Sequence, residues 1–416
     1  MKSYLIENAR IFDGSGSPCF PGSVRVEGER IAMVAAGEQP LPRESAEVID
    51  AGGRVLMPGL VDAHTHLAFP SSIERLVPSF GLPPEESLLI SARHARILLD
   101  HGFTSAYSAG TLAPRLDIVI RDEIKAGRLP GPRLRACAVE QFPASMAALF
   151  HADPSTNDSG PDGVRRYVKS AAATGVDVVK FCLSGENQLS PGSSHEVCYS
   201  DEEVLAAGEQ ARESGIWLSA HAQSSKPIQQ ALKAGFRVIY HCTFADEETL
   251  DLMEQSREQI FVAPAVGVLQ GTIESGPLPG LPLDRMQSDA KDDIKLLSDL
   301  VPRLRSRKIR VLPGGDYGFV WNPTGRNARD LEHFVELFGY TPTDALVAAT
   351  KLGGEIMGMG DELGLIKENY LADLLIVDGD PLKDIRILQD ASRFLLIMQG
   401  GNAHKNTISE RLRRAA

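Results

Sequence analysis

Met57-Pro-Gly-Leu-Val-Asp-Ala-His-Thr-His-Leu67 joins an apolar run to an acid and two histidines. The run Leu56–Val61 predicts a short strand, and Asp62, His64 and His66 follow it directly. Because residues i and i+2 of an extended strand project from the same face, we expect the two imidazoles to point together. Two converging imidazoles make half of a metal site, whereas the alternative is a pair of surface histidines beside a turn. The rest of the chain decides between these interpretations.

Seven further strand-like apolar runs follow, and helix-like segments separate several of them. The strand candidates are residues 104–110, 133–139, 176–182, 217–222, 238–243, 261–266 and 310–315, and the helix candidates include 84–101, 201–214 and 227–234. Alternation of strands with helices is typical of a parallel sheet. Eight such units over roughly 300 residues favour a (β/α)8 TIM barrel over an open sheet.

The two ends of the chain have a different character. Residues 1–56 predict short strands with tight turns, and residues 370–378 and 394–398 predict two more strands near the C-terminus. Neither piece is large enough to be stable alone, so we expect both ends to share one small β-sandwich. The predicted domains are therefore a discontinuous β-sandwich (1–56 with 360–416) and a barrel (57–359).

Composition limits the classes of function. The chain has 416 residues, a net charge of −12 and an apolar fraction of 43%, which argues for a soluble protein and against a nucleic-acid partner. Its five cysteines are scattered without a CxxC pair, which favours a reducing compartment over a disulfide framework. No run is apolar for long enough to cross a bilayer, and the N-terminus lacks the pattern of a signal peptide. We expect a cytoplasmic protein that binds no membrane.

The ends of the predicted strands carry the chemistry, because barrel active sites form at the C-terminal ends of the strands. Lys180 lies within strand four, His221 and His241 close strands five and six, and Asp316 follows strand eight. A single histidine at a strand end is more often structural, and the alternative for a lone buried lysine is a pair with a carboxylate. Together with the first two histidines, however, these residues predict a metal site.

These motifs resemble the amidohydrolase superfamily over essentially the whole chain. The matching segments are Pro58 to His66, Gly175 to Lys180, His221, His241, Gly314-Gly-Asp316 and the tail Tyr370 to Pro381. Val176 to Lys180, followed by Ser184-Gly185, is similar to the branch that contains imidazolonepropionase-like and prolidase-like enzymes.

The resemblance implies a site with two divalent metal ions. His64, His66 and Asp316 would hold the more buried ion, and His221 and His241 the more exposed one. Lys180, carboxylated to N6-carboxylysine, would bridge them as an anionic oxygen ligand. Imidazole and oxygen donors suit zinc best, although manganese, cobalt or iron would also fit. A metal-bridging hydroxide would be the nucleophile, and Asp316 would be the catalytic general base and then acid.

Several functions stay open at this point. Hydrolysis of a C–N amide bond, in an N-acyl amino acid or a dipeptide-like small molecule, ranks first. Carbamate, aryl urea, lactone or phosphotriester hydrolysis would use the same activated water. A mononuclear deaminase-type enzyme ranks lower, because His221-Ala-Gln-Ser-Ser-Lys226 lacks the glutamate that deaminases usually carry there. A non-catalytic scaffold ranks last, because all six ligand positions are filled.

Substrate selection is expected in the loops after the strands. Residues 140–142, 184–199 and 317–321 are the predicted linings, with Tyr107, Gln223 and Tyr317 as candidate substrate contacts. Tyr240, in an alternating strand, is predicted to point away from the metals. The expected partner is a small-molecule substrate, and a homo-oligomer would be compatible with the sequence.

Overall fold

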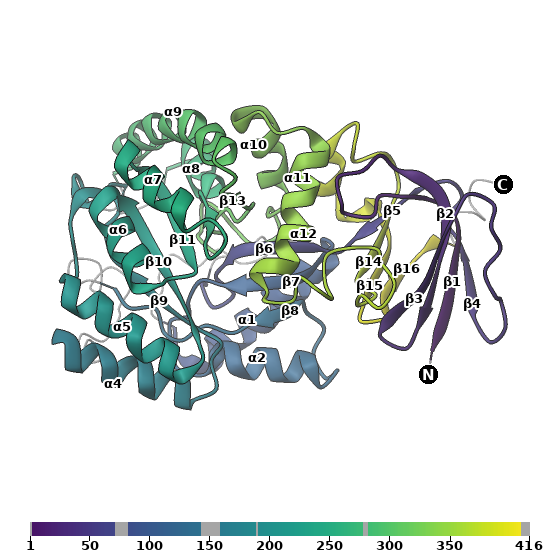
Figure 1. Ribbon diagram of the computed structural model, residues 1–416, viewed down its shortest axis with the longest axis horizontal. Helices are drawn as coiled ribbons and strands as arrows, with labels where there is room; N and C mark the ends of the chain where they lie inside the picture. Colours follow the sequence, from purple (N-terminus) through teal and green to yellow (C-terminus); the bar gives the residue numbers. More distant parts are fainter. Residues whose placement is uncertain (1, 71–81, 143–158, 189, 278–281, 409–416) are drawn as a thin grey trace.

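The structure is a computed structural model that describes residues 2–70, 82–142, 159–188, 190–277 and 282–408. Figure 1 shows a barrel with helices around it on one side and a sheet built from both chain ends on the other. The two parts are contiguous, and strand β5 leads directly into the first barrel strand.

The barrel is built, within the described ranges, from eight parallel strands in two regular ladders. They are β6 (Leu60–Thr65), β7 (Phe103–Ser108) and β8 (Arg133–Arg135), then β9 (Val178–Cys182), β10 (Trp217–Ser224), β11 (Val238–Phe244), β12 (Phe261–Ala263) and β13 (Arg310–Val311). Isolated parallel bridges join the ladders on both sides, Cys137 with Val178 and Thr65 with Tyr317. The strands therefore follow one another around a ring, which agrees with the predicted (β/α)8 architecture.

Helices cover the outside of this ring (Figure 1). They are α1 (Pro84–Asp100), α2 (Leu116–Lys125), α4 (Gly160–Ala173), α5 (Asp201–Ser214), α6 (Ser225–Ala234), α7 (Glu247–Gln255), α8 (Val266–Glu274), α9 (Leu283–Ser306), α10 (Arg329–Phe338), α11 (Pro342–Ala349) and α12 (Lys351–Ile356). The predicted bounds of α5 are correct, since a capping box of Ser200 with Glu203 starts it and Gly215, in the left-handed region, ends it. None of the helices among the described residues is long and apolar enough to cross a membrane.

Alternate strand residues face the inside and outside of the barrel. Val178, Val238 and Tyr240 belong to the interior cluster, whereas Val179 and Ile239 pack outward under the helices. Because side chains of a strand point to opposite faces in turn, each barrel strand contributes to two cores. Tyr240 therefore faces the barrel interior, and the prediction that it points away from the site is wrong.

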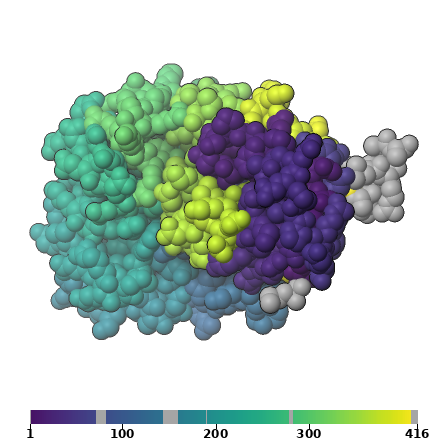
Figure 2. Space-filling view, turned by 45° about the vertical axis from the view of Figure 1, so that its right-hand side comes forward, coloured from purple at the N-terminus to yellow at the C-terminus, as the bar shows by residue number. Residues whose placement is uncertain are grey.

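The two chain ends pair in a single eight-stranded sheet. Its strands are β1 (Ser3–Ile11), β2 (Phe20–Glu27), β3 (Arg30–Ala36), β4 (Glu47–Asp50) and β5 (Val55–Pro58) from the N-terminus, with β14 (Leu374–Val377), β15 (Phe394–Gln399) and β16 (Asn402–Asn406) from the C-terminus. Strand β5 pairs with β1 on one side and with β14 on the other. Figure 2 shows N-terminal and C-terminal residues side by side on this flank of the molecule.

The predicted strand Leu56–Val61 is in fact two strands, because the chain passes from the sheet to the barrel at Gly59. Pro58 ends β5 and Leu60 begins β6. At Gly59 the backbone runs so close to β7 that an added Cβ would lie 2.0 Å from Oγ1 of Thr104. A residue with a side chain cannot occupy this crossing without displacing Thr104.

Candidate metal centre and active site

The first group of candidate ligands comes from β6 and from the segment after β13. Nε2 of His64 and Nε2 of His66 lie 3.4 Å and 3.2 Å from Oδ1 of Asp316. Gly314 permits this approach, because an added Cβ there would lie 2.7 Å from the backbone nitrogen of His64. The expectation that His64 and His66 converge is met, and Asp316 lies with them.

The second group comes from the ends of β10 and β11. The rings of His221 and His241 lie 4.2 Å apart, centroid to centroid. Two groups of three residues could each hold a metal ion, because one ligand atom from each member lies within 4.8 Å of the other two. The groups are His221 with His241 and Glu186, and His64 with His241 and Asp316. His241 therefore stands between the two groups, which makes the four histidines and Asp316 one continuous cluster.

Burial keeps the imidazoles of His64, His221 and His241 neutral. It lowers the pKa of His64 and of His241 well below the ordinary value, and that of His221 to about 4. The lysine ammonium of Lys180 contributes in the same direction. A histidine must be neutral to bind a metal, so these rings have the required protonation state at neutral pH.

The hydrogen bonds of the cluster also suit a metal. Nδ1 of His66 donates to the carbonyl of Gly110 at 3.1 Å, which leaves Nε2 with a lone pair facing Asp316. Within the described part of the chain, both ring nitrogens of His64, Nε2 of His241 and Oδ1 of Asp316 are buried without a hydrogen-bond partner. Buried polar atoms are normally paired, so this set of nitrogen and oxygen donors fits one or two divalent ions.

Lys180 lies beside the cluster with a partner that the sequence does not predict. Its Nζ is 3.0 Å from Oε1 of Glu140 and donates to the carbonyl of Ala109 at 3.3 Å. Burial lowers the pKa of Lys180, but the carboxylates of Glu140 and Asp316 raise it, and the net shift is upward. The sequence predicts Glu140 only as part of a loop that lines the site. The sequence feature that could have pointed to its role is the position of an acid at the end of the third predicted strand.

Tyr240 forms the floor under the histidines. Its ring stacks on His64 at 3.8 Å, its hydroxyl donates to the carbonyl of Ala63 at 3.1 Å, and Nζ of Lys180 lies 4.6 Å above the ring. His241 reaches the same site because it and Cys242 adopt positive φ angles of 72° and 64°. This break in alternation explains why two consecutive residues of β11 both face the cluster, which a regular strand would not allow.

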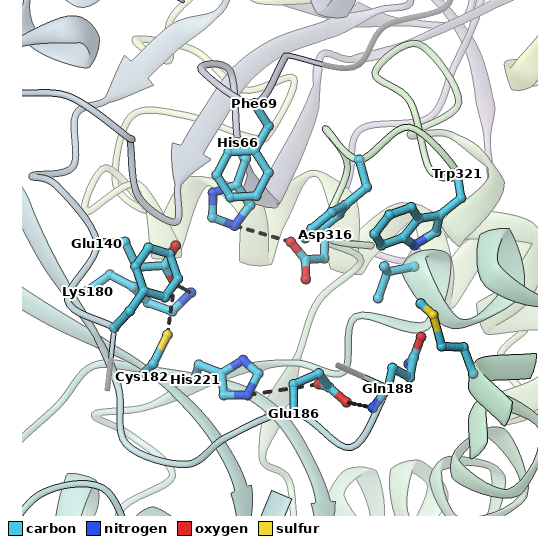
Figure 3. Close-up of a pocket in the computed structure, with 14 residues that line it drawn as sticks. His66, Phe69, Glu140, Lys180, Cys182, Glu186, Gln188, His221, Asp316 and Trp321 are labelled. Carbon is cyan, nitrogen blue, oxygen red and sulfur yellow. Dashed lines mark hydrogen bonds and ion pairs between the residues drawn. The ribbon is translucent and has the colours of Figure 1, made fainter. Parts of the chain in front are cut away.

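The cluster opens into a cavity whose empty space, part of it open to solvent, is about 550 Å³. Figure 3 shows His66, Lys180, His221 and Asp316 pointing into it from different sides. Apart from the site residues already named, its walls are Phe69, Phe142, Cys182, Gln188, Val268, Met286, Phe319 and Trp321. The predicted loops supply several of these residues, whereas Phe69, Cys182, Val268 and Met286 lie outside the predicted linings.

The three candidate substrate contacts need correction, because none of them lines the cavity. Tyr107 is buried in the barrel interior, where Arg135 lies 5.8 Å from the centre of its ring. Tyr317 lies behind Asp316 and donates to Asp330 at 3.1 Å. Gln223 is buried and donates from Nε2 to Oε2 of Glu186 at 2.6 Å, so it would act through that glutamate.

The chain is similar to known proteins over most of its length. The model of the Amidohydrolase family matches residues 55–260 and 321–403, well over half of the chain. Ochratoxinase from Aspergillus niger is 25% identical over 97% of this chain and 87% of its own. Imidazolonepropionase from Caldanaerobacter subterraneus subsp. tengcongensis is 26% identical over 84% of this chain and 82% of its own.

Solved structures share the fold along almost the whole chain. A Xaa-Pro dipeptidase with methionine bound in its active site superposes with a TM-score of 0.82 at 24% identity, over 97% of this chain and 100% of the other. Phenylurea hydrolase B superposes with a TM-score of 0.71 at 21% identity, over 97% and 96% of the two chains. The chain belongs to the amidohydrolase family and is a hydrolase of C–N bonds.

Proposed function

We propose that this protein hydrolyses a C–N bond of a small molecule at a centre with two divalent ions. His64, His66 and Asp316 would hold one ion and His221 and His241 the other, and Lys180, carboxylated on Nζ, would supply an anionic oxygen ligand to both. The observation that carries the proposal is the set of neutral imidazoles and buried atoms without hydrogen-bond partners beside an open cavity. Zinc suits this mixture of donors best.

When bound, the ions supply Lewis acidity, which lowers the pKa of water and polarises the scissile carbonyl. Asp316 accepts the proton of the attacking water and returns it to the leaving nitrogen, since its carboxylate both lines the cavity and contacts the histidines. The hydrogen bond from His66 to Gly110 holds the ring in one tautomer. The aromatic walls exclude water from the substrate.

Two classes of substrate are compatible with this chemistry. Amides come first, either N-acyl amino acids or dipeptide-like molecules, as the name of the Xaa-Pro dipeptidase with the same fold suggests. Carbamates and ureas come second, and phenylurea hydrolase B is a structural neighbour named for such a substrate. Both classes are neutral at the reacting carbonyl.

We also propose that the enzyme works in the cytoplasm.

Metal content per chain, measured on protein purified without chelators, tests the centre. The parent should contain about two ions, whereas Lys180→Ala should lose at least one together with nearly all activity towards amides and carbamates. Lys226→Ala, an exposed lysine on α6 that pairs with Asp201, is the matched control and should change neither. A metal content of one ion per chain in both the parent and Lys180→Ala would contradict the proposal that carboxylated Lys180 bridges two ions.

The contact between Lys180 and Glu140 favours a second candidate. If Lys180 keeps its ammonium, its pair with Glu140 leaves no anionic bridge, and a single ion would remain in the site. A mononuclear, deaminase-type hydrolase of a cyclic C–N bond would then be the better description. A single ion in the parent, with release of ammonia or ring opening in a screen of cyclic substrates, would identify it.

A further inference from the structure

One wall of the cavity consists of side chains that carry no charge. We call the four residues of this wall the apolar subsite: Val268, Met286, Phe319 and Trp321. Figure 3 shows Asp316 between Trp321 on one side of the cavity and Lys180 on the other. A substrate whose C–N bond lies beside Asp316 can therefore extend a nonreacting group towards the apolar subsite.

The rings beside this wall form a continuous row that starts at the candidate metal centre. Phe69 stacks on His66 with ring centroids 4.0 Å apart, and it meets Phe319 edge to face at 5.2 Å. Phe319 in turn stacks on Trp321, with centroids 4.9 Å apart and ring planes tilted by 23°. Aromatic rings attract one another in these two geometries, so an aromatic group of the substrate can continue the row.

The loop that carries Phe319 and Trp321 is held in one conformation. Nδ2 of Asn322 donates to the carbonyls of Gly315 and Asp316 at 2.8 Å and 3.0 Å. Helix α8 packs directly on the backbone of the loop, since a Cβ added to Gly271 would lie 2.7 Å from the carbonyl oxygen of Trp321. The indole and phenyl rings are therefore positioned before a substrate arrives, which reduces the entropy lost on binding.

The helices that carry the other two residues of the apolar subsite are tied to each other and to this loop. Gln287, directly after Met286 on α9, donates from Nε2 to the carbonyl of Ile273 on α8 at 3.0 Å. At the end of α8, Oε1 of Glu274 accepts from Arg329 of α10 at 2.6 Å. The subsite therefore has fixed walls on the helix side as well, and its shape can discriminate between substrates.

We infer that the substrate carries a planar aromatic group, which packs in the apolar subsite while the C–N bond lies beside Asp316. The inference rests on the proposed hydrolase function and narrows it to aromatic amides, carbamates or ureas. Phe319 and Trp321 are specificity-determining residues, and Val268 and Met286 limit the space for the bound ring. None of these four side chains ionises, so the selection does not depend on the charge of the metal centre.

A matched series of three neutral amides tests the preference for an aromatic group. The compounds are the N-acetyl amides of alanine, phenylalanine and cyclohexylalanine amide, which share one scissile bond and differ only in a methyl, benzyl or cyclohexylmethyl side chain. A second series places the same groups on the acyl side, as propanoyl, 3-phenylpropanoyl and 3-cyclohexylpropanoyl derivatives of glycine amide. Release of the free amine gives kcat/KM for each compound on the metal-loaded enzyme.

The wild type should prefer the phenyl compound in the series that it cleaves. Burial of the ring should raise kcat/KM by about tenfold or more over the compound without a ring. The cyclohexyl compound has a similar apolar area but cannot stack, so the phenyl compound should exceed it by about threefold or more.

Substitution of each tryptophan locates the effect, because the chain has only two. Trp321→Leu should lower the preference for the phenyl compound over the compound without a ring by about fivefold or more. Trp217→Leu is the matched control and should leave the preference unchanged. Trp217 begins β10, whereas His221 lies towards the other end of that strand, and Trp217 is not among the described residues that line the cavity.

Two further measurements do not depend on the folding of Trp321→Leu. Trp217→Leu leaves Trp321 as the sole tryptophan, so its fluorescence in stopped-flow mixing should change with the phenyl compound before turnover and not with the compound without a ring. Val268→Phe fills the apolar subsite and should weaken the phenyl compound by about tenfold relative to the compound without a ring.

The outcomes separate this inference from the hydrolase proposal. Cleavage without a preference for the phenyl compound, or a preference that neither Trp321→Leu nor Val268→Phe changes, would overturn the inference and leave the hydrolase in place. Equal rates for phenyl and cyclohexyl compounds would also overturn it, because the subsite would then select apolar area and not an aromatic ring. If the fluorescence of Trp321 shows the expected order of binding but no amide, carbamate or urea is cleaved, the selection stands and the hydrolase proposal fails.

Discussion

Strands β6 and β11 deliver histidines to the same cluster by different means. His64, in β6, and His66, directly after it, are two residues apart and both approach Asp316, and no residue of β6 has a positive φ. In β11, Tyr240 and His241 are adjacent, and both reach the site because His241 and Cys242 adopt left-handed backbone angles.

The ladders show how each strand leaves regular geometry. Between β6 and β7 the register shifts between Asp62 and Thr65. Between β10 and β11 the register shifts between two pairings, that of His241 with Ala222 and that of Phe244 with Ser224. Non-glycine residues in the left-handed region cost roughly 1 kcal/mol or more each, so β11 stores strain at its ligand whereas β6 does not. The spacing of two residues is enough to bring His64 and His66 together. The adjacent Tyr240 and His241 both reach the site only because the backbone of β11 is left-handed there.

The largest expected effect comes from removing one histidine from each strand. His64→Asn and His241→Asn should each lower the metal content and reduce kcat/KM by about a thousandfold or more, since several kcal/mol of transition-state stabilisation depend on the ions. Asparagine tolerates positive φ, so His241→Asn removes the imidazole without changing the backbone of β11.

The control for these variants is His94→Asn. His94 is buried on α1, bonds through Nδ1 to the carbonyl of Leu67 at 2.9 Å and belongs to neither group of candidate ligands. It should keep its metal even if it loses stability. A full metal complement in His241→Asn, with loss only in His64→Asn, would show that the strained strand supplies no ligand.

The same contrast explains what could be predicted from the sequence. Period-two spacing and the position of ionisable residues at strand ends are local properties. The amino-acid order alone therefore predicts that His64, His66, His221, His241 and Asp316 lie together. The alternation of strands and helices predicts the barrel for the same reason. The division of Leu56–Val61 at Gly59 is not predicted, because a continuous apolar run does not show where one sheet ends and another begins.

The remaining features depend on contacts between distant segments. Glu140 meets Lys180 only after β8 and β9 become neighbours, and its role cannot be inferred from an acid in a loop. Tyr240 is predicted on the wrong face because regular alternation lets only one of two adjacent residues, here His241, face the site. Val268 and Met286 line the cavity from helices α8 and α9, where the pattern of ionisable residues at strand ends gives no signal.

A second prediction uses proton binding in the metal-free protein. Burial lowers the pKa of His221 from 6.5 to about 4, so between these values the unfolded chain binds a proton that the folded protein does not. Stability from neutral His221 is therefore fully present above pH 6.5 and is lost as the pH falls towards 4. The full difference is on the order of 3 kcal/mol.

Urea unfolding of chelator-treated wild type and His221→Asn at pH 4.5 and pH 7 measures this contribution. The wild type should gain stability relative to the variant as the pH rises. His241→Asn should show a change at least as large, because burial lowers the pKa of His241 well below its ordinary value. A difference between wild type and His221→Asn that is independent of pH would mean that the ring is not kept neutral by burial.

The smallest expected effect tests the floor of the site. Tyr240→Phe keeps the ring that stacks on His64 but loses the hydrogen bond to the carbonyl of Ala63, so it should cost about 1 kcal/mol of unfolding free energy and leave the metal content unchanged.

Tyr107→Phe is the matched control: its hydroxyl is buried without a hydrogen-bond partner among the described residues, so its removal should be neutral or stabilising. Equal losses in both variants would indicate that the hydroxyl of Tyr240 contributes only through packing. A loss of metal in Tyr240→Phe would instead mean that this hydrogen bond positions His64, and that β6 too depends on its neighbour to present a ligand.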